Sequence, residues 1–235
     1  MIFTPWEISG DPTRDRRPGY ASDLQLVHAS LVTMTETAAK AIGVATTALL
    51  NQDLESVRLT ASLEEKLEEG GLLIERRTLH LLARQQPVAS DLRMLVSAIK
   101  IGAECQRMGA LACHIATAAN RSYPAPAIPA EVSGIFRRMG DVAGRIADGA
   151  GVTLNTSDTL DATRLEVDDD AMDGLRRALF RALRKDWSHG VEAAVDVALL
   201  GRYYERFADH AVAIAQSVIF IVTGMKSHVG GSHVG

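Results

Sequence analysis

The sequence comprises 235 residues, with 25 Lys and Arg, 29 Asp and Glu, and a formal charge of -4. Hydrophobic residues make up 47% of it, which excludes intrinsic disorder for most of the chain, and aromatic residues make up only 5%. An apolar content that is mostly Ala, Leu, Val and Ile favours packed helices over a β-sandwich or barrel. The slightly acidic balance argues against a nucleic-acid-binding protein.

Prolines divide the chain. All seven lie in three places: the N-terminal segment, position 87, and the stretch 124–129. Because proline breaks helix interiors, residues 19–86 and 130–235 are free to be helical. We expect residues 1–19 to be a flexible segment, residues 122–129 a Pro-rich linker, and residues 225–235, which repeat Ser-His-Val-Gly, a disordered tail.

The first half predicts three helices. Apolar residues recur at steps of three and four from Leu24 to Ala48, which predicts a helix over about residues 20–51. Asp53 then offers the N-cap of a charged helix over about residues 53–84, which continues through Gly70-Gly71 because its apolar spacing continues. Pro87 suits the first turn of a third helix, which runs to the linker.

The second half repeats this organisation. We expect helices over about residues 130–154, 159–185 and 191–222, with Thr223-Gly224 as the final stop. Residues 101–110 (IGAECQRMGA) align with residues 200–209 (LGRYYERFAD), which indicates internal duplication of a three-helix unit. The predicted fold is therefore all-α, with six helices arranged as two tandem three-helix bundles over residues 20–121 and 130–224.

Carboxylates interrupt the apolar seam of the last helix. Glu205 occupies a position that the seam reserves for apolar side chains, and Asp209 follows one turn later on the same face. The preceding helix carries a similar pair, Asp169 and Asp173. Burying a carboxylate is unfavourable by roughly several kcal/mol unless its charge is compensated. Four such groups predict a site for a hard divalent or trivalent metal ion of unknown identity.

A simpler reading of these carboxylates stays open. Glu205 and Asp209 could pair with Arg202 and Arg206, and residues 168–170 could be a solvated face. His210, beside Asp209, is a weaker candidate ligand. In the first repeat Glu64 and Glu68 retain the first pair, whereas Gln106 and Ala110 replace the second, so we expect any metal site there to be weak or absent.

Cysteine spacing and hydropathy indicate the compartment. Cys105 and Cys113 lie on one predicted helix about 12 Å apart, too far for a disulfide. No apolar run reaches the roughly 18 residues of a membrane span, and the N-terminus lacks the pattern of a signal peptide. We therefore expect a reduced, cytoplasmic protein without direct membrane insertion.

Two motifs follow each other on the duplicated scaffold, residues 85–93 (QQPVASDLR) and residues 204–211 (YERFADHA). Together with the duplication they resemble the PhoU family of phosphate-signalling regulators, and the resemblance covers about residues 20–224. Residues 107–112 (RMGALA) and 195–202 (VDVALLGR) are similar to the actinobacterial branch of that family.

The resemblance implies a dimeric, cytoplasmic adaptor rather than an enzyme. Such a protein would be a negative regulator of phosphate uptake and the phosphate-starvation response, linking the ATPase subunit of the phosphate ABC transporter to a membrane sensor histidine kinase. The family's Glu/Asp-x-x-x-Asp motifs carry metal ions in several members, and they correspond here to Glu205 and Asp209, supported by Asp169 and Asp173.

The competing function class is a metal-dependent enzyme, such as a carboxylate-bridged oxidase or a phosphohydrolase. It would need an open coordination position and a nearby general acid or base. The sequence has neither a phosphate-binding Gly-x4-Gly-Lys-Ser/Thr loop nor the Glu-x-x-His pairs of ferritin-like diiron enzymes. These features favour the adaptor.

Overall fold

Six helices form the fold. The computed structural model describes residues 19–85, 87, 90–157, 161–185 and 187–225. The helices are α1 (Tyr20–Asn51), α2 (Leu54–Gln85), α3 (Ser90–Ser122), α4 (Ala130–Thr156), α5 (Asp161–Arg184) and α6 (Gly190–Thr223), and the described residues contain no strand. The all-α prediction is confirmed. Most of the predicted N-terminal segment and tail, residues 1–18 and 226–235, lies outside the described residues.

Local chemistry explains where the helices end. Asp53 caps α2: its Oδ1 accepts the backbone N–H of Glu55 at 3.0 Å, and its Oδ2 accepts the hydroxyl of Ser56 at 2.6 Å. Gly224 ends α6 with φ 73°, a left-handed conformation that favours glycine, and its N–H donates to the Phe220 carbonyl. Both ends agree with the sequence patterns that predicted them.

A close approach between helices explains the glycine pair inside α2. A Cβ added at Gly71 would lie 2.3 Å from Cδ of Gln106 on α3. Glycine is less favourable than alanine inside a helix by about 1 kcal/mol. Here it makes room for a polar side chain of the neighbouring helix.

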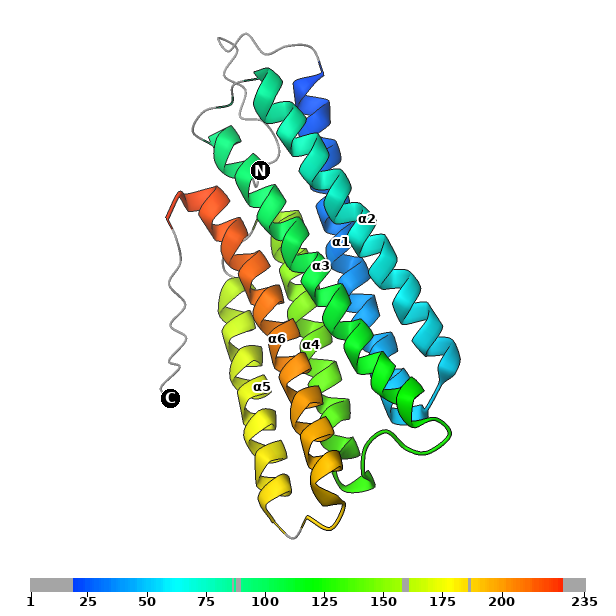
Figure 1. Ribbon diagram of the computed structural model, residues 1–235. Helices are drawn as coiled ribbons and strands as arrows, with labels where there is room; N and C mark the ends of the chain where they lie inside the picture. Colours follow the sequence, from blue (N-terminus) through cyan, green and yellow to red (C-terminus); the bar gives the residue numbers. More distant parts are fainter. Residues whose placement is uncertain (1–18, 86, 88–89, 158–160, 186, 226–235) are drawn as a thin grey trace.

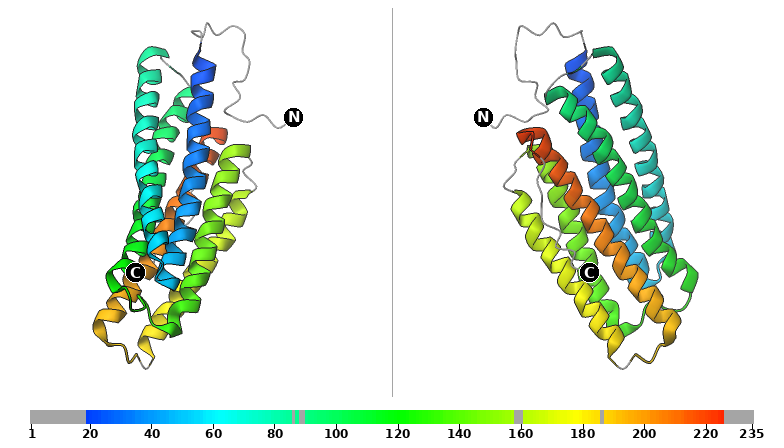
Figure 2. Two further views of the ribbon diagram at one scale, coloured as in Figure 1. Left: turned by 90° about the vertical axis from the view of Figure 1, so that its right-hand side faces the viewer. Right: turned by 60° about the vertical axis from the view of Figure 1, so that its left-hand side comes forward.

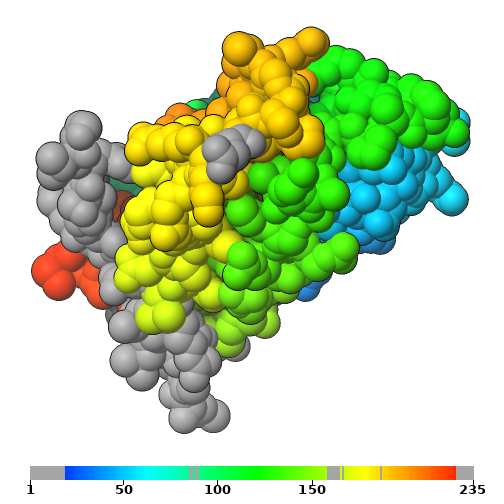
Figure 3. All heavy atoms as spheres, turned by 90° about the horizontal axis from the view of Figure 1, so that it is seen from below, coloured from blue at the N-terminus to red at the C-terminus, as the bar shows by residue number. Residues whose placement is uncertain are grey.

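The helices pack in two groups of three that share a wide contact. α1, α2 and α3 contact one another, as do α4, α5 and α6, while α1 lies against α4 and α3 lies against α6. The central helices are therefore α1, α3, α4 and α6, with α2 and α5 at opposite edges (Figures 1 and 2). The connections α1–α2, α3–α4 and α5–α6 gather at one end of the molecule (Figure 3).

One continuous core runs through both groups. The buried apolar residues of all six helices form a single cluster. At the α1–α4 contact, a Cβ added at Gly140 would lie 2.5 Å from Oγ1 of Thr46, so the backbones approach closely there. The predicted halves are thus packed directly on each other, in addition to being joined by the 122–129 connection.

Polar contacts cross between the two groups. Thr46 of α1 and the fully buried Tyr204 of α6 have their hydroxyl oxygens 2.9 Å apart. Glu104 of α3 accepts a hydrogen bond from His210 of α6 over 2.6 Å, and both side chains are largely buried. At the end of α3, Arg121 pairs with Asp196 at 2.8 Å. The first contact joins α1 to α6, and the other two join α3 to α6.

The apolar character of α6 exceeds the expectation from uninterrupted apolar runs. By length and composition alone α6 could cross a membrane. The most apolar part of α6 is 39% buried inside the bundle, packed on α3, α4 and α5. A core helix of a soluble protein passes the same test, so this property is weak evidence for membrane insertion.

Candidate carboxylate site between α5 and α6

Glu205 is buried, as its position in the seam predicts. The residue is 4% exposed, and its neighbours Tyr204, Phe207 and Ala208 on α6 are fully buried. About one turn earlier on α6, Gly201 packs so closely on α5 that a Cβ added there would lie 2.5 Å from Cδ2 of Leu179. The helix therefore carries a carboxylate into a closely packed contact, where charge must be compensated.

Two arginines compensate Glu205. Arg202 Nη1 lies 2.7 Å from Glu205 Oε2, and Arg176 Nε of α5 lies 3.5 Å from Oε1. Neither contact has the geometry of a hydrogen bond, so Oε2 and Arg176 Nε are both buried without one. The charges are balanced by proximity, while Glu205 Oε2 stays a buried carboxylate oxygen without a hydrogen bond among the described residues.

The other three carboxylates lie around Glu205. Partial burial, and then the negative charges of Asp209, Asp173, Asp170 and Glu205, raise the pKa of Asp169. Partial burial and the charge of Glu205 raise the pKa of Asp209, although Arg202 and Arg206 oppose the shift. Asp173 is half-buried and lies 3.8 Å from Arg176 and 3.7 Å from Arg177. The structure therefore brings the four predicted residues to one face.

The donor set is suitable for a hard cation, whereas its present arrangement is an ion-pair cluster. Oxygen-only ligands suit such cations, and Glu205 offers an oxygen without a hydrogen bond. Within the part of the chain that the structure describes, however, no three His, Cys, Asp or Glu side chains converge closely enough to hold a metal ion. Of the predicted arginine pairings, that of Glu205 with Arg202 is present.

Sequence reasoning missed Arg176. Its distances to Glu205 and Asp173 place it between the two helices. Its spacing from Asp173, i to i+3 on α5, was an available signal. The candidate ligand His210 points elsewhere, to Glu104 of α3.

The corresponding surface of the first half is chemically different. Gln106 Nε2 donates to Glu68 Oε2 at 3.0 Å and to the Glu68 carbonyl at 3.3 Å, so an amide occupies the place of the second carboxylate. Burial and a hydrogen bond with Glu64 raise the pKa of the Cys113 thiol to about 11, so this thiol stays protonated at neutral pH. Cys105 and Cys113 are both free, as expected from their spacing.

Comparisons with known proteins give a consistent result. The family model described as the PhoU domain matches residues 31–119 and 136–218, one stretch in each half. The chain is 45% identical over 209 residues to the "Phosphate-specific transport system accessory protein PhoU homolog 2" of Mycobacterium tuberculosis, covering 88% of this chain and 98% of that protein. It is 44% identical to the PhoU homolog 1 of Mycobacterium leprae, covering 88% and 94%.

Solved structures share the fold. The crystal structure of PhoU from Pseudomonas aeruginosa superposes with a TM-score of 0.77 at 23% identity, covering 88% of this chain and 100% of that one. The phosphate transport system regulatory protein PhoU from Streptococcus pneumoniae gives a TM-score of 0.78 at 21% identity, covering 88% and 99%. At these identities the likeness concerns the arrangement of helices.

Proposed function

This chain belongs to the PhoU family, and on that premise we propose that it is an accessory protein of a phosphate transport system that restrains phosphate uptake and the phosphate-starvation response. It does so as a cytoplasmic, dimeric adaptor between the transporter's ATPase subunit and a membrane sensor histidine kinase. The observation that carries this proposal is the 45% identity to a phosphate-specific transport accessory protein over almost the whole of that relative.

Exposed apolar side chains support an adaptor. Val191, Val195 and Leu199 follow one another at i, i+4 and i+8 on α6 and are 81%, 51% and 46% exposed. Phe180 on the neighbouring α5 is 40% exposed. Apolar groups gathered on one face are a common feature of surfaces that bind proteins. This apolar stripe and the carboxylate site lie on the same two helices.

The carboxylate site would act on the adaptor through α5 and α6. We propose that Glu205, Asp209, Asp169 and Asp173 bind a divalent or trivalent cation. The cation would compete with Arg176 and Arg202 for the carboxylate oxygens. It would also offset the burial and the repulsion between carboxylates that together raise the pKa of Asp169 and Asp209. Bound metal would then fix α5 against α6 and favour one set of partner contacts over another.

The metal proposal is tested by elemental analysis of purified protein. The double variant Glu205→Ala/Asp209→Ala should carry less bound metal than the wild type, whereas Glu64→Ala/Glu68→Ala, at the carboxylate pair that the first half retains, should leave it unchanged. Equal metal content in the wild type and the α6 variant would refute the assignment.

The adaptor proposal is tested by a pull-down with the two partners. The wild type should capture the transporter's ATPase subunit and the kinase, in proportions that differ between high and low phosphate. Val195→Glu/Leu199→Glu should weaken capture, and Val152→Glu, which changes a residue of similar exposure (48%) on α4, should not. Failure to capture either partner refutes the adaptor, and metal-dependent turnover of a generic phosphoester would support the enzyme instead.

A further inference from the structure

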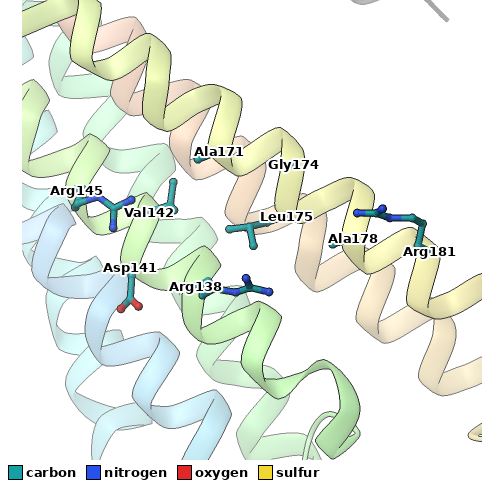
Figure 4. Close-up of a pocket in the computed structure, with 9 residues that line it drawn as sticks. All are labelled: Arg138, Asp141, Val142, Arg145, Ala171, Gly174, Leu175, Ala178 and Arg181. Carbon is teal, nitrogen blue, oxygen red and sulfur yellow. The ribbon is translucent and has the colours of Figure 1, made fainter.

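An open groove lies on the other side of α5. It has a volume of about 540 Å³ and runs between α4 and α5. Arg138 and Arg145 of α4 stand along one wall and Arg181 of α5 along the other, while Val142 and Leu175 supply an apolar floor (Figure 4). α6 contacts both helices from behind, so the groove opens away from the carboxylate site.

The groove is wide because the residues of α5 that line it are mostly small. A Cβ added at Gly174 would meet only the Nη2 atom of Arg177, at 4.0 Å. Ala171 and Ala178, each about one turn from Gly174 on either side along α5, also line the groove with small side chains. A helix laid in the groove could therefore approach α5 closely, as small residues at helix contacts allow.

The three arginines of the groove differ in whether they have an ion-pair partner. Arg145 is held by Asp168, with Nη2 and Nε at 2.8 Å and 3.2 Å from its Oδ1. Among the described residues, neither Arg138 nor Arg181 has an ion pair or a side-chain hydrogen bond. Two guanidinium groups thus border an apolar floor, and although Asp141 of α4 also lines the groove, its three arginines outnumber Asp141 and the Asp168 that pairs with Arg145. This combination is complementary to an acidic, amphipathic surface.

The spacing of the arginines favours an extended partner over a compact anion. Arg138 and Arg145 are two helical turns apart, about 10.5 Å along α4. Asp168 of α5 lies beside Arg145 of α4, and Arg181 lies farther along the groove on the opposite wall (Figure 4). A single phosphate group is best bound by donors that converge on one point, and these arginines are spread out.

The duplicated half lacks this arrangement. Adding 105 to the residue number carries the buried residues Leu67 and Ile74 of α2 onto the buried Met172 and Leu179 of α5. The same shift places Arg76 at Arg181 and Lys40 at Arg145, but Thr33 at Arg138. The arginine at position 138 is therefore a property of the second half, and Arg76 serves as a matched control position.

We propose that the α4–α5 groove is a docking site for an amphipathic helix of a partner protein that carries acidic residues along both edges of an apolar strip. The apolar strip lies on Val142 and Leu175, and the carboxylates pair with Arg138 and Arg181. This mode buries an apolar helix face in a groove and uses charge at the rims for orientation.

The full-length protein tests this with a stapled helical peptide of about 20 residues, roughly 30 Å long. Its apolar strip is Leu and Ala, with Glu on both edges, and a second peptide has Lys for Glu. Fluorescence anisotropy should show binding of the Glu peptide, at least about tenfold weaker binding of the Lys peptide, and weaker binding of the Glu peptide at higher salt.

Variants locate the binding site. Arg138→Glu/Arg181→Glu should weaken binding of the Glu peptide by at least about tenfold. Gly174→Leu, which fills the groove without changing charge, should do the same. Arg137→Glu/Arg184→Glu, at exposed arginines of the same helices, and Arg76→Glu should leave affinity within about threefold. Urea unfolding of each variant checks that it is folded.

Four results overturn the proposal. They are no binding of the Glu peptide to the wild type, equal loss in the groove and control variants, no loss in Gly174→Leu, and displacement of the peptide by millimolar inorganic phosphate at constant ionic strength. The last result would assign the groove to a small anion. None of these outcomes depends on the pull-down that tests the adaptor.

Discussion

Replacing Thr46 by valine tests the polar contact that joins the two helix groups through the core. The Thr46 hydroxyl donates to the Ile42 carbonyl at 2.7 Å. Its single hydrogen is therefore used, and the Tyr204 hydroxyl must be the donor in the 2.9 Å contact with Thr46 Oγ1. Burial also raises the pKa of Tyr204, so the phenol keeps its proton.

The two single substitutions should differ in size. Thr46→Val leaves the fully buried Tyr204 O–H without an acceptor, which should reduce the free energy of unfolding by about 1–3 kcal/mol. Tyr204→Phe removes the donor, while the Thr46 hydroxyl keeps its bond to Ile42, so the loss should be only about 0.5–1.5 kcal/mol. In the double variant no unpaired donor remains, and adding Tyr204→Phe to Thr46→Val should restore stability.

Urea unfolding followed by circular dichroism measures all four proteins of this cycle. The m-value should stay constant, so that midpoints report stability. Thr47→Val is the control, because the neighbouring Thr47 is exposed and its hydroxyl only donates to Gly43, at 3.0 Å; its stability should be close to that of the wild type. If the double variant is less stable than Thr46→Val alone, the assignment of donor and acceptor is wrong.

Three further predictions concern the same framework. Gly140→Ala would place a Cβ 2.5 Å from Oγ1 of Thr46, a β-branched side chain that has little freedom to move, so the free energy of unfolding measured in urea should fall by about 1–3 kcal/mol. Gly134→Ala is the control, because a Cβ there meets nothing within 4 Å, and its free energy of unfolding should not fall. The pKa of Asp209 is raised, so its favourable contribution to stability is present in acid and is lost as pH rises through the folded pKa. Asp209→Asn should therefore have a higher urea midpoint than the wild type at pH 7, by a margin that shrinks toward pH 4. A lower midpoint than the wild type at pH 7 would contradict this. Although burial opposes ionisation, His210 and Arg107 lower the pKa of Glu104, so its contribution to stability is present above its unfolded pKa and is lost as pH falls. Glu104→Gln should be less stable than the wild type at pH 7 and converge with it in acid. A difference in stability that does not change with pH would exclude this linkage.

The helices and their seams were predictable because they depend on local spacing. A period of three and four residues from Leu24 to Ala48 lies on α1, and the cap at Asp53 depends only on the two residues that it contacts. The duplication also predicted the arrangement of the helices, because a repeated three-helix unit implies two similar groups of three helices. Burial of Glu205 followed from the same periodicity.

Long-range pairing was not predictable. Whether Glu205 meets a metal ion, Arg202 or Arg176 depends on how α5 and α6 are rotated about their axes, which spacing along each helix leaves open. The contact between Glu104 and His210 joins residues far apart in the sequence, with no motif linking them. The direct packing of the halves depends on a small residue, Gly140, that has no distinctive pattern around it.

The single core limits how the two helix groups can move relative to each other. Because α1, α3, α4 and α6 share one apolar interior, the two groups cannot hinge about the 122–129 connection without breaking close packing. α2 and α5 lie at opposite edges of this shared interior, so the packing of the four central helices fixes the distance between them. Molecules bound at the α2 and α5 edges would be kept at a set separation, so a signal would pass by exchange of bound partners, without bending of the bundle.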